Sequence, residues 1–162
     1  MARLKLYAEE QEEYKDLNDL SFKSRKDVEK VFRKLYRHFQ IKSKTTIVYD
    51  KRTNGGAVSK YTWSPYLTLH LPKIKKVRLY TLAHEMAHIL SFSRYNYASH
   101  DKTHKRLMAM ICRYIRKKNY FSSEIEYKRR YIEIECEDVA KYLFDNVKIT
   151  KEDLTKTREE TK

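Results

Sequence analysis

Two histidines four residues apart, inside an otherwise apolar segment, constrain the fold of this chain more than any other feature. They belong to the pentad His84-Glu85-Met86-Ala87-His88. Residues at positions i and i+4 lie on one face of an α-helix, so both imidazoles can bind the same Zn²⁺. The glutamate between them is the expected general base. The pentad therefore predicts a metal-binding helix with His84 and His88 as ligands and Glu85 as the catalytic residue.

The residues around the pentad predict how this helix packs. We expect a helix over about 76–92, and its apolar residues gather on the side opposite the two histidines: Leu79, Leu82, Ala83, Met86, Ile89 and Leu90. A metal site requires this division, because packing must hold the ligands while their nitrogen atoms face a cavity. The alternative is a surface helix whose two histidines face solvent.

A catalytic zinc site usually has three protein ligands, so the pentad predicts a third ligand elsewhere. His100 is our first choice, because it follows a predicted loop that can return the chain to the pentad helix. His104 is the alternative, although it falls on the apolar face of the next predicted helix, which favours packing or support of a ligand. The remaining alternative is a downstream carboxylate: Glu124, Glu126 or Glu135.

The charge of the chain is strongly positive. It has 36 Lys and Arg against 22 Asp and Glu, a net charge of +14. Such a surface attracts polyanions, of which nucleic acid is the commonest. Two basic rows have helical spacing, one formed by Lys26, Lys30, Arg33 and Arg37 and the other by Lys102, Arg106, Arg113 and Lys117. We predict that these rows contact DNA, the alternative being two solvated helix faces.

Other functional classes fit the composition less well. No apolar run approaches the ~20 residues of a membrane-spanning helix, and the N-terminus does not resemble a signal peptide. The two cysteines, Cys112 and Cys136, form neither a disulfide framework nor a Cys-x-x-Cys site. We therefore expect an intracellular monomer, cytoplasmic or associated with DNA, without membrane contact.

Local patterns predict the remaining elements. Ser24 followed by Asp27 is a capping-box signature for a helix that ends near Gln40, and a further helix is expected over 103–117. Residues 45–49, 57–63 and 66–71 read as strands of a small antiparallel sheet, with Asn54-Gly55-Gly56 as a turn. After Ser122 the pattern is ambiguous, with a strand over 131–135 or a capped helix before it, and then a helix over 138–146.

These elements predict an α+β fold. A three- to four-stranded, mainly antiparallel sheet should pack on the pentad helix and on two or more further helices. Residues 1–22 form an N-terminal arm or helix, residues 23–148 form one domain with its core in 25–118, and residues 149–162 form a polar, flexible tail.

Two stretches of the sequence carry a resemblance to a known family. They are Leu79-Tyr80-Thr81-Leu82-Ala83-His84-Glu85-Met86-Ala87-His88-Ile89-Leu90 and Ser99-His100-Asp101-Lys102-Thr103-His104. Over roughly residues 25–118 the chain resembles the SprT-like (Spartan-type) metalloprotease domain, a zincin. The resemblance implies a Zn²⁺-dependent endopeptidase that acts on proteins bound or crosslinked to DNA. It gives His84, His88 and His100 the ligand roles and Glu85 the role of base.

The chain departs from the family pattern at three points. Asp101 stands where the family usually has Gly, His104 stands where it usually has Phe or Trp, and a four-cysteine zinc ribbon is absent.

The substrate backbone is expected along the edge strand before the pentad helix. Tyr95 and Tyr97 are candidates for stabilising the oxyanion, although packing is the commoner role for a tyrosine. Two other classes stay open: a basic nucleic-acid-binding protein with a structural or inactive zinc site, and a zincin protease unrelated to DNA.

Overall fold

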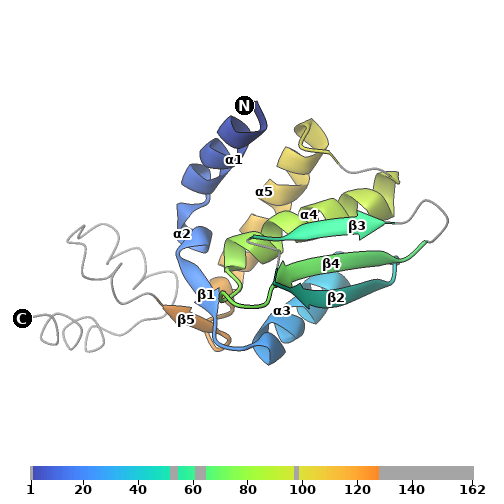
Figure 1. Ribbon diagram of the computed structural model, residues 1–162. Helices are drawn as coiled ribbons and strands as arrows, with labels where there is room; N and C mark the ends of the chain where they lie inside the picture. The colour runs from blue at the N-terminus through green and yellow to red at the C-terminus, as the bar shows by residue number, and fades with distance from the viewer. Residues whose placement is uncertain (1, 52–54, 61–64, 97–98, 128–162) are drawn as a thin grey trace, which may run out of the picture.

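The computed structural model describes residues 2–51, 55–60, 65–96 and 99–127. The fold is α+β, as predicted (Figure 1). In chain order its elements are α1 Ala2–Glu13, α2 Lys15–Asn18, β1 Leu20–Phe22, α3 Arg25–His38, β2 Thr45–Asp50, β3 Ala57–Lys60, β4 Leu67–Pro72, α4 Leu79–Tyr95, α5 Lys102–Lys117, the 3-10 turn η1 Asn119–Phe121 and β5 Ile125–Tyr127. The predicted elements at 131–135 and 138–146 and the tail from residue 149 lie outside the described residues.

The larger sheet is mixed, in the order β2-β4-β3. Strand β4 pairs parallel with β2 and antiparallel with β3, so β2 and β3, on either side of the predicted turn at 54–56, are not neighbours. The sheet has three strands, as predicted, but one of its two pairings is parallel where a mainly antiparallel sheet was expected. The physical reason is burial. Leu67, Leu69 and Leu71 of β4 are fully buried, whereas β2 and β3 alternate between partly buried and exposed residues. The most apolar strand therefore takes the central position.

A second, two-stranded sheet was not predicted. Strand β1 pairs antiparallel with β5, with Leu20 opposite Tyr127. Tyr14, Leu17, Leu20 and Phe22 are buried in the same cluster as the helices of the predicted domain. The segment after α1 is therefore part of this core.

Helices α3 and α5 lie within two residues of their predicted bounds. The Asp27 N–H donates to Ser24 Oγ at 3.2 Å, which is the predicted cap of α3. Helix α4 begins at Leu79, three residues later than predicted, because the Phe22 N–H donates to the carbonyl of Val77 and Arg78 bridges to Ser21. These contacts hold residues 77–78 extended.

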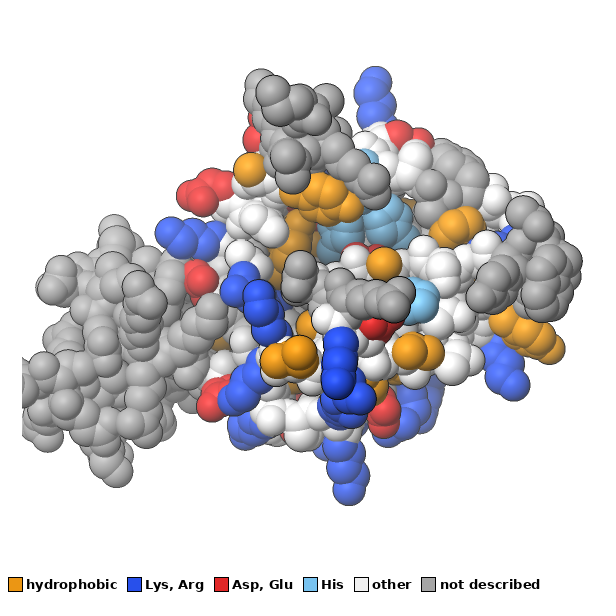
Figure 2. Space-filling model, in the orientation of Figure 1, with side chains coloured by type: hydrophobic (Ala, Val, Ile, Leu, Met, Phe, Trp, Pro, Cys, Tyr) orange, Lys and Arg blue, Asp and Glu red, His pale blue; other side chains and the backbone are white. Residues whose placement is uncertain are grey.

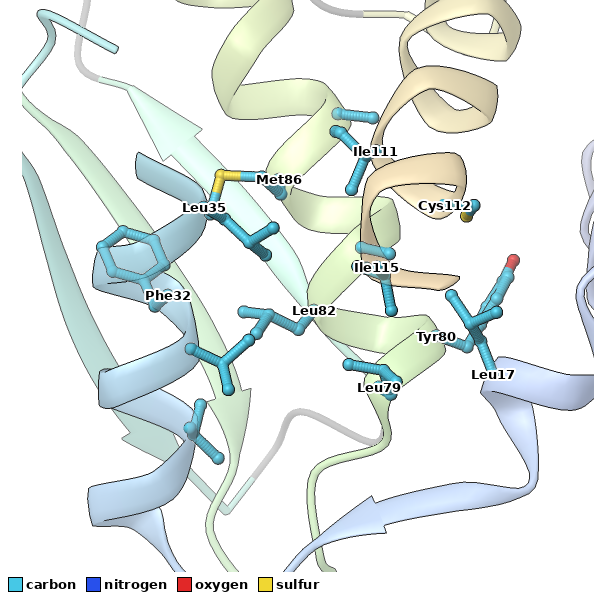
Figure 3. Packing of buried hydrophobic residues seen from close by; sticks show 14 of the residues in the cluster. Leu17, Phe32, Leu35, Leu79, Tyr80, Leu82, Met86, Ile111, Cys112 and Ile115 are labelled. Carbon is cyan, nitrogen blue, oxygen red and sulfur yellow. The ribbon is translucent and has the colours of Figure 1, made fainter. Parts of the chain in front are cut away.

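The core surrounds α4. Figure 3 shows apolar side chains of α4 lying between those of α3 and those of α5: Leu79, Leu82 and Met86 of α4, Phe32 and Leu35 of α3, and Ile111 and Ile115 of α5. Buried residues run through α4 from Leu79 to Ser91, and they include the polar side chains of the pentad. Within the described part of the chain, no helix has the length and apolar character needed to cross a membrane.

Glu124 anchors the end of the described chain to α3. It is 1% exposed, and its Oε1 lies 3.1 Å from both Lys30 Nζ and Lys34 Nζ, while Ser123 Oγ donates to its other oxygen. Burial alone would raise the pKa of Glu124, but the hydrogen bonds from Ser123, Lys34 and Lys30 outweigh burial and lower the pKa to about 2.

We predict that Glu124→Gln lowers the free energy of unfolding at pH 7 by about 2 kcal/mol. Because the folded-state pKa lies below the ordinary value of 4.5, this contribution is complete above about pH 5 and is lost as the pH falls toward 2. Urea unfolding of both proteins at several pH values measures it. Glu126→Gln, at a half-exposed ion pair with Lys76, is the matched control and should cost under about 1 kcal/mol at every pH. Equal losses in both variants would contradict the prediction.

Candidate metal centre

Two elements bring three imidazoles together. His84 and His88 lie one turn apart on α4 and are 3% and 9% exposed, and His100 precedes α5. The Nε2 atom of His100 lies 3.2 Å from Nε2 of His84 and 3.1 Å from Nε2 of His88. Asp101 Oδ1 accepts hydrogen bonds from the N–H groups of Thr103 and His104 and so caps α5. The aspartate thereby fixes the start of α5 at Lys102, two residues after His100.

The three nitrogen atoms have the spacing that a zinc ion requires. Zn–N distances of about 2.0–2.1 Å in tetrahedral geometry place the ligand nitrogens about 3.3 Å apart. The Nε2 atom of His100 lies 3.2 Å from Nε2 of His84 and 3.1 Å from Nε2 of His88, and both separations are close to this value. Three neutral imidazoles are also a donor set that suits Zn²⁺. The side chains predicted as ligands therefore fit the ion, and zinc binding itself stays a prediction.

Glu10, on α1, holds the first of these histidines, and sequence reasoning missed it. Its Oε1 accepts hydrogen bonds from Nδ1 of His84 at 2.5 Å and from the Tyr80 hydroxyl at 2.6 Å. A carboxylate on Nδ1–H fixes the tautomer that leaves the Nε2 lone pair available to a metal. Burial acts to raise the pKa of Glu10, but the hydrogen bond and charge of His84 prevail and lower it, which keeps the carboxylate ionised.

His104 packs behind the ligands. It is buried, its Nε2 donates to the carbonyl of His84 at 3.2 Å, and its Nδ1 lies 3.7 Å from Glu10 Oε2. Burial, reinforced by the charge of His84, lowers the pKa of His104 to about 4, so the ring is neutral near pH 7. Donor atoms of Glu10, His84 and His104 also lie close enough to hold an ion. However, the 2.5 Å between Glu10 Oε1 and His84 Nδ1 leaves no room for an ion between them, so we assign this group to supporting the predicted ligands.

Tyr7 brings a hydroxyl to the same point. Its OH lies 2.9 Å from Nε2 of His100, and its ring centroid lies 4.9 Å from that of His100 and 5.3 Å from that of His84. Of the tyrosines considered from the sequence, Tyr95 is 51% exposed and Tyr97 lies outside the described residues. The sequence holds no clear signal for this contribution of α1, because the helix has no broad apolar face and the three- or four-residue spacing of 7, 10, 14 and 17 runs beyond its end at Glu13.

Glu85 lines a cavity of about 610 Å³ together with His84, Tyr7 and Tyr80. The residue is 5% exposed, and burial raises the pKa of its carboxyl group to about 7. Gly56, just before β3, approaches this side chain closely. A Cβ atom at residue 56 would lie 2.8 Å from Cγ of Glu85 and 2.9 Å from Cγ2 of Thr81. Only glycine lets the start of β3 pass this close to the predicted base.

The remaining predicted site residues lie away from the histidines. Glu124 pairs with Lys30 and Lys34, Glu126 pairs with Lys76, and Glu135 is outside the described residues. All eight residues of the two basic rows are exposed: Lys26, Lys30, Arg33, Arg37, Lys102, Arg106, Arg113 and Lys117. The C-terminal ends of α3 and α5 meet where His38 stacks on Tyr114 with ring centroids 3.6 Å apart. DNA contact by these rows stays a prediction.

Comparison of the chain with protein-family models, with curated proteins and with solved structures gives no match. The site is therefore defined by its own geometry: three converging imidazoles, a carboxylate on one of them, a hydroxyl beside another, and a buried glutamate facing a cavity.

We predict that Glu10→Gln weakens zinc binding by about 10- to 100-fold, because the amide cannot supply the charge that orients and polarises His84. Competition against a chelator of known affinity measures the change. Glu9→Gln is the matched control, since Glu9 is exposed on the same helix. Equal zinc affinity in Glu10→Gln and the wild type would show that this carboxylate does not support the ligand.

Proposed function

We propose that this protein is a zinc-dependent metalloendopeptidase with a zincin-like site, of the SprT-like type. One observation carries the proposal: three imidazole Nε2 atoms converge at zinc spacing, and a buried glutamate on the same helix faces the adjoining cavity. Structural zinc sites have four protein ligands, whereas hydrolytic sites have three and leave a position for water. The combination of three histidines, a base and a cavity favours hydrolysis.

Each residue of the proposed site has its own role in the reaction. Zinc held by His84, His88 and His100 would acidify a water molecule and polarise the carbonyl of the scissile peptide bond. Glu85 would accept the proton of the attacking water on its carboxylate and then deliver it to the leaving nitrogen. The Tyr7 hydroxyl would donate a hydrogen bond to the carbonyl oxygen as negative charge develops on it. Glu10 and His104 would hold His84 in orientation throughout.

The substrate backbone would lie along β3. The strand directly before α4 in sequence, β4, is central in the larger sheet, and of the two edge strands of that sheet β3 makes the more extensive contact with α4. Among the described strands β3 pairs with β4 alone, so its other edge would accept an added peptide strand. Because the approach of Gly56 brings the start of β3 against Glu85, a peptide on this edge would pass the base.

The exposed basic rows on α3 and α5 support a substrate associated with DNA. A net charge of +14 and two rows of cations at helical spacing would bind phosphates and bring the protease to DNA-bound or crosslinked proteins. A zincin without a DNA role, and a nucleic-acid-binding protein with an inactive zinc site, are the two alternatives. Cleavage of a basic DNA-binding protein, measured with and without single-stranded DNA, separates them.

We predict that Glu85→Gln keeps its zinc but loses peptide cleavage by about 10²- to 10⁴-fold, because the amide cannot accept the proton of water. The assay is cleavage of the same DNA-binding protein, with zinc content measured on each sample. Glu12→Gln, an exposed position on α1, should cleave as well as the wild type. Wild-type activity in Glu85→Gln would exclude this residue as the base.

We predict that Tyr7→Phe lowers kcat by about 10²- to 10³-fold while KM and zinc affinity stay within about twofold of wild type, as for loss of one oxyanion donor. Tyr95→Phe, at an exposed tyrosine, is the control and should change none of the three. A loss of zinc affinity with kcat unchanged would mean that Tyr7 only packs on the ligands.

A further inference from the structure

The cavity beside Glu85 has an unusual distribution of charge. Its described lining includes three cationic residues, Lys75, Lys76 and Arg78, and one carboxylate, that of Glu85. The cations come from the exposed segment that links β4 to α4. Figure 2 views this face and shows histidine side chains at its centre with Lys and Arg side chains gathered below them.

Much of this positive charge is not neutralised by an acidic partner among the described residues. Lys76 pairs with Glu126, but Arg78 Nη1 donates to the neutral amide oxygen of Asn18 at 3.1 Å. No ion pair is present at Lys75 within the described chain. A guanidinium has five N–H donors, so Arg78 keeps donors for a planar anion while its contact with Asn18 holds it in place.

The position of Arg78 is set by the backbone. It precedes the first residue of α4, and its bridge to Ser21 of β1 ties it to the second sheet. His84 and Glu85, six and seven residues after Arg78, line the same cavity, and so do Gly55 and Gly56 just before β3. A peptide laid on β3 would therefore direct a side chain into this cavity next to the bond that is cut.

We propose that the cavity is a substrate subsite that takes an acidic side chain, Asp or Glu, adjacent to the scissile bond. The proposal rests on the proposed peptidase function and adds the chemical class of residue that the enzyme selects. Concave walls of one charge sign focus the field and concentrate the oppositely charged group. A carboxylate in the cavity would meet Arg78 and Lys75 of its lining, whereas a Lys or Arg side chain there would meet like charge.

The test uses three peptides that differ only at the residue next to the cut: Glu, Gln and Lys. For the zinc-loaded full chain we expect kcat/KM in the order Glu, Gln, Lys, with Glu favoured over Lys by about 10- to 100-fold. Arg78→Gln can still donate to Asn18 but lacks the charge, so the Glu-to-Lys ratio should fall several-fold. Arg78→Glu should invert the order. Lys42→Glu makes the same charge change at an exposed position outside the cavity and should leave the ratio unchanged.

The outcomes distinguish a failure of the subsite proposal from a failure of the peptidase proposal. Equal cleavage of the three peptides, or an unchanged ratio in Arg78→Gln, overturns the subsite and leaves the proposed peptidase intact. Cleavage of none of them, nor of any protein substrate, by zinc-loaded wild type overturns the peptidase and the subsite with it. An unchanged ratio together with weaker oligonucleotide binding by Arg78→Gln would assign the cavity to nucleic-acid phosphate, which also overturns the proposal.

Discussion

The burial of α4 is the constraint on which the rest of the structure depends, because this helix carries two imidazoles and a carboxylate into the interior. A buried polar group without a partner costs about 1–3 kcal/mol. Glu10 from α1 accepts a hydrogen bond from His84 Nδ1, His104 from α5 donates to the carbonyl of His84, and Nε2 of His100 contacts the Nε2 atoms of His84 and His88. These partners come from segments far apart in the sequence, so the site forms only when the whole core closes around α4.

The features that depend on local patterns could be predicted from the sequence. Apolar residues at helical spacing, together with the cap at Ser24, gave α3 and α5 within two residues of their bounds. The shared face of His84 and His88 follows from helix geometry alone. The position of His100 beside these histidines was predicted from the length of the loop before it and from the resemblance of its motif. In the structure, Nε2 of His100 lies within 3.2 Å of Nε2 of His84 and of His88.

Features that depend on contacts between distant segments could not be predicted in the same way. Strand β4 pairs with β2 because its three buried leucines place it at the centre of the sheet. The alternating pattern within a single strand does not tell which of the three strands is the central one. Helix α1 is mostly polar and has no broad apolar face, so nothing local indicates that Tyr7 and Glu10 reach residues more than 70 positions away. These two residues make the N-terminal helix part of the site. The sequence predicted an arm or helix over residues 1–22 but no role for it in the site.

The central claim is that His84, His88 and His100 bind a catalytic zinc ion. It is tested most directly by the zinc content of purified wild type, His100→Ala and His104→Ala after dialysis against a weak chelator. About one zinc per chain in the wild type, its loss in His100→Ala and its retention in most of the His104→Ala protein are the expected results. Zinc absent from the wild type, or kept by His100→Ala and lost by His104→Ala, would contradict the claim.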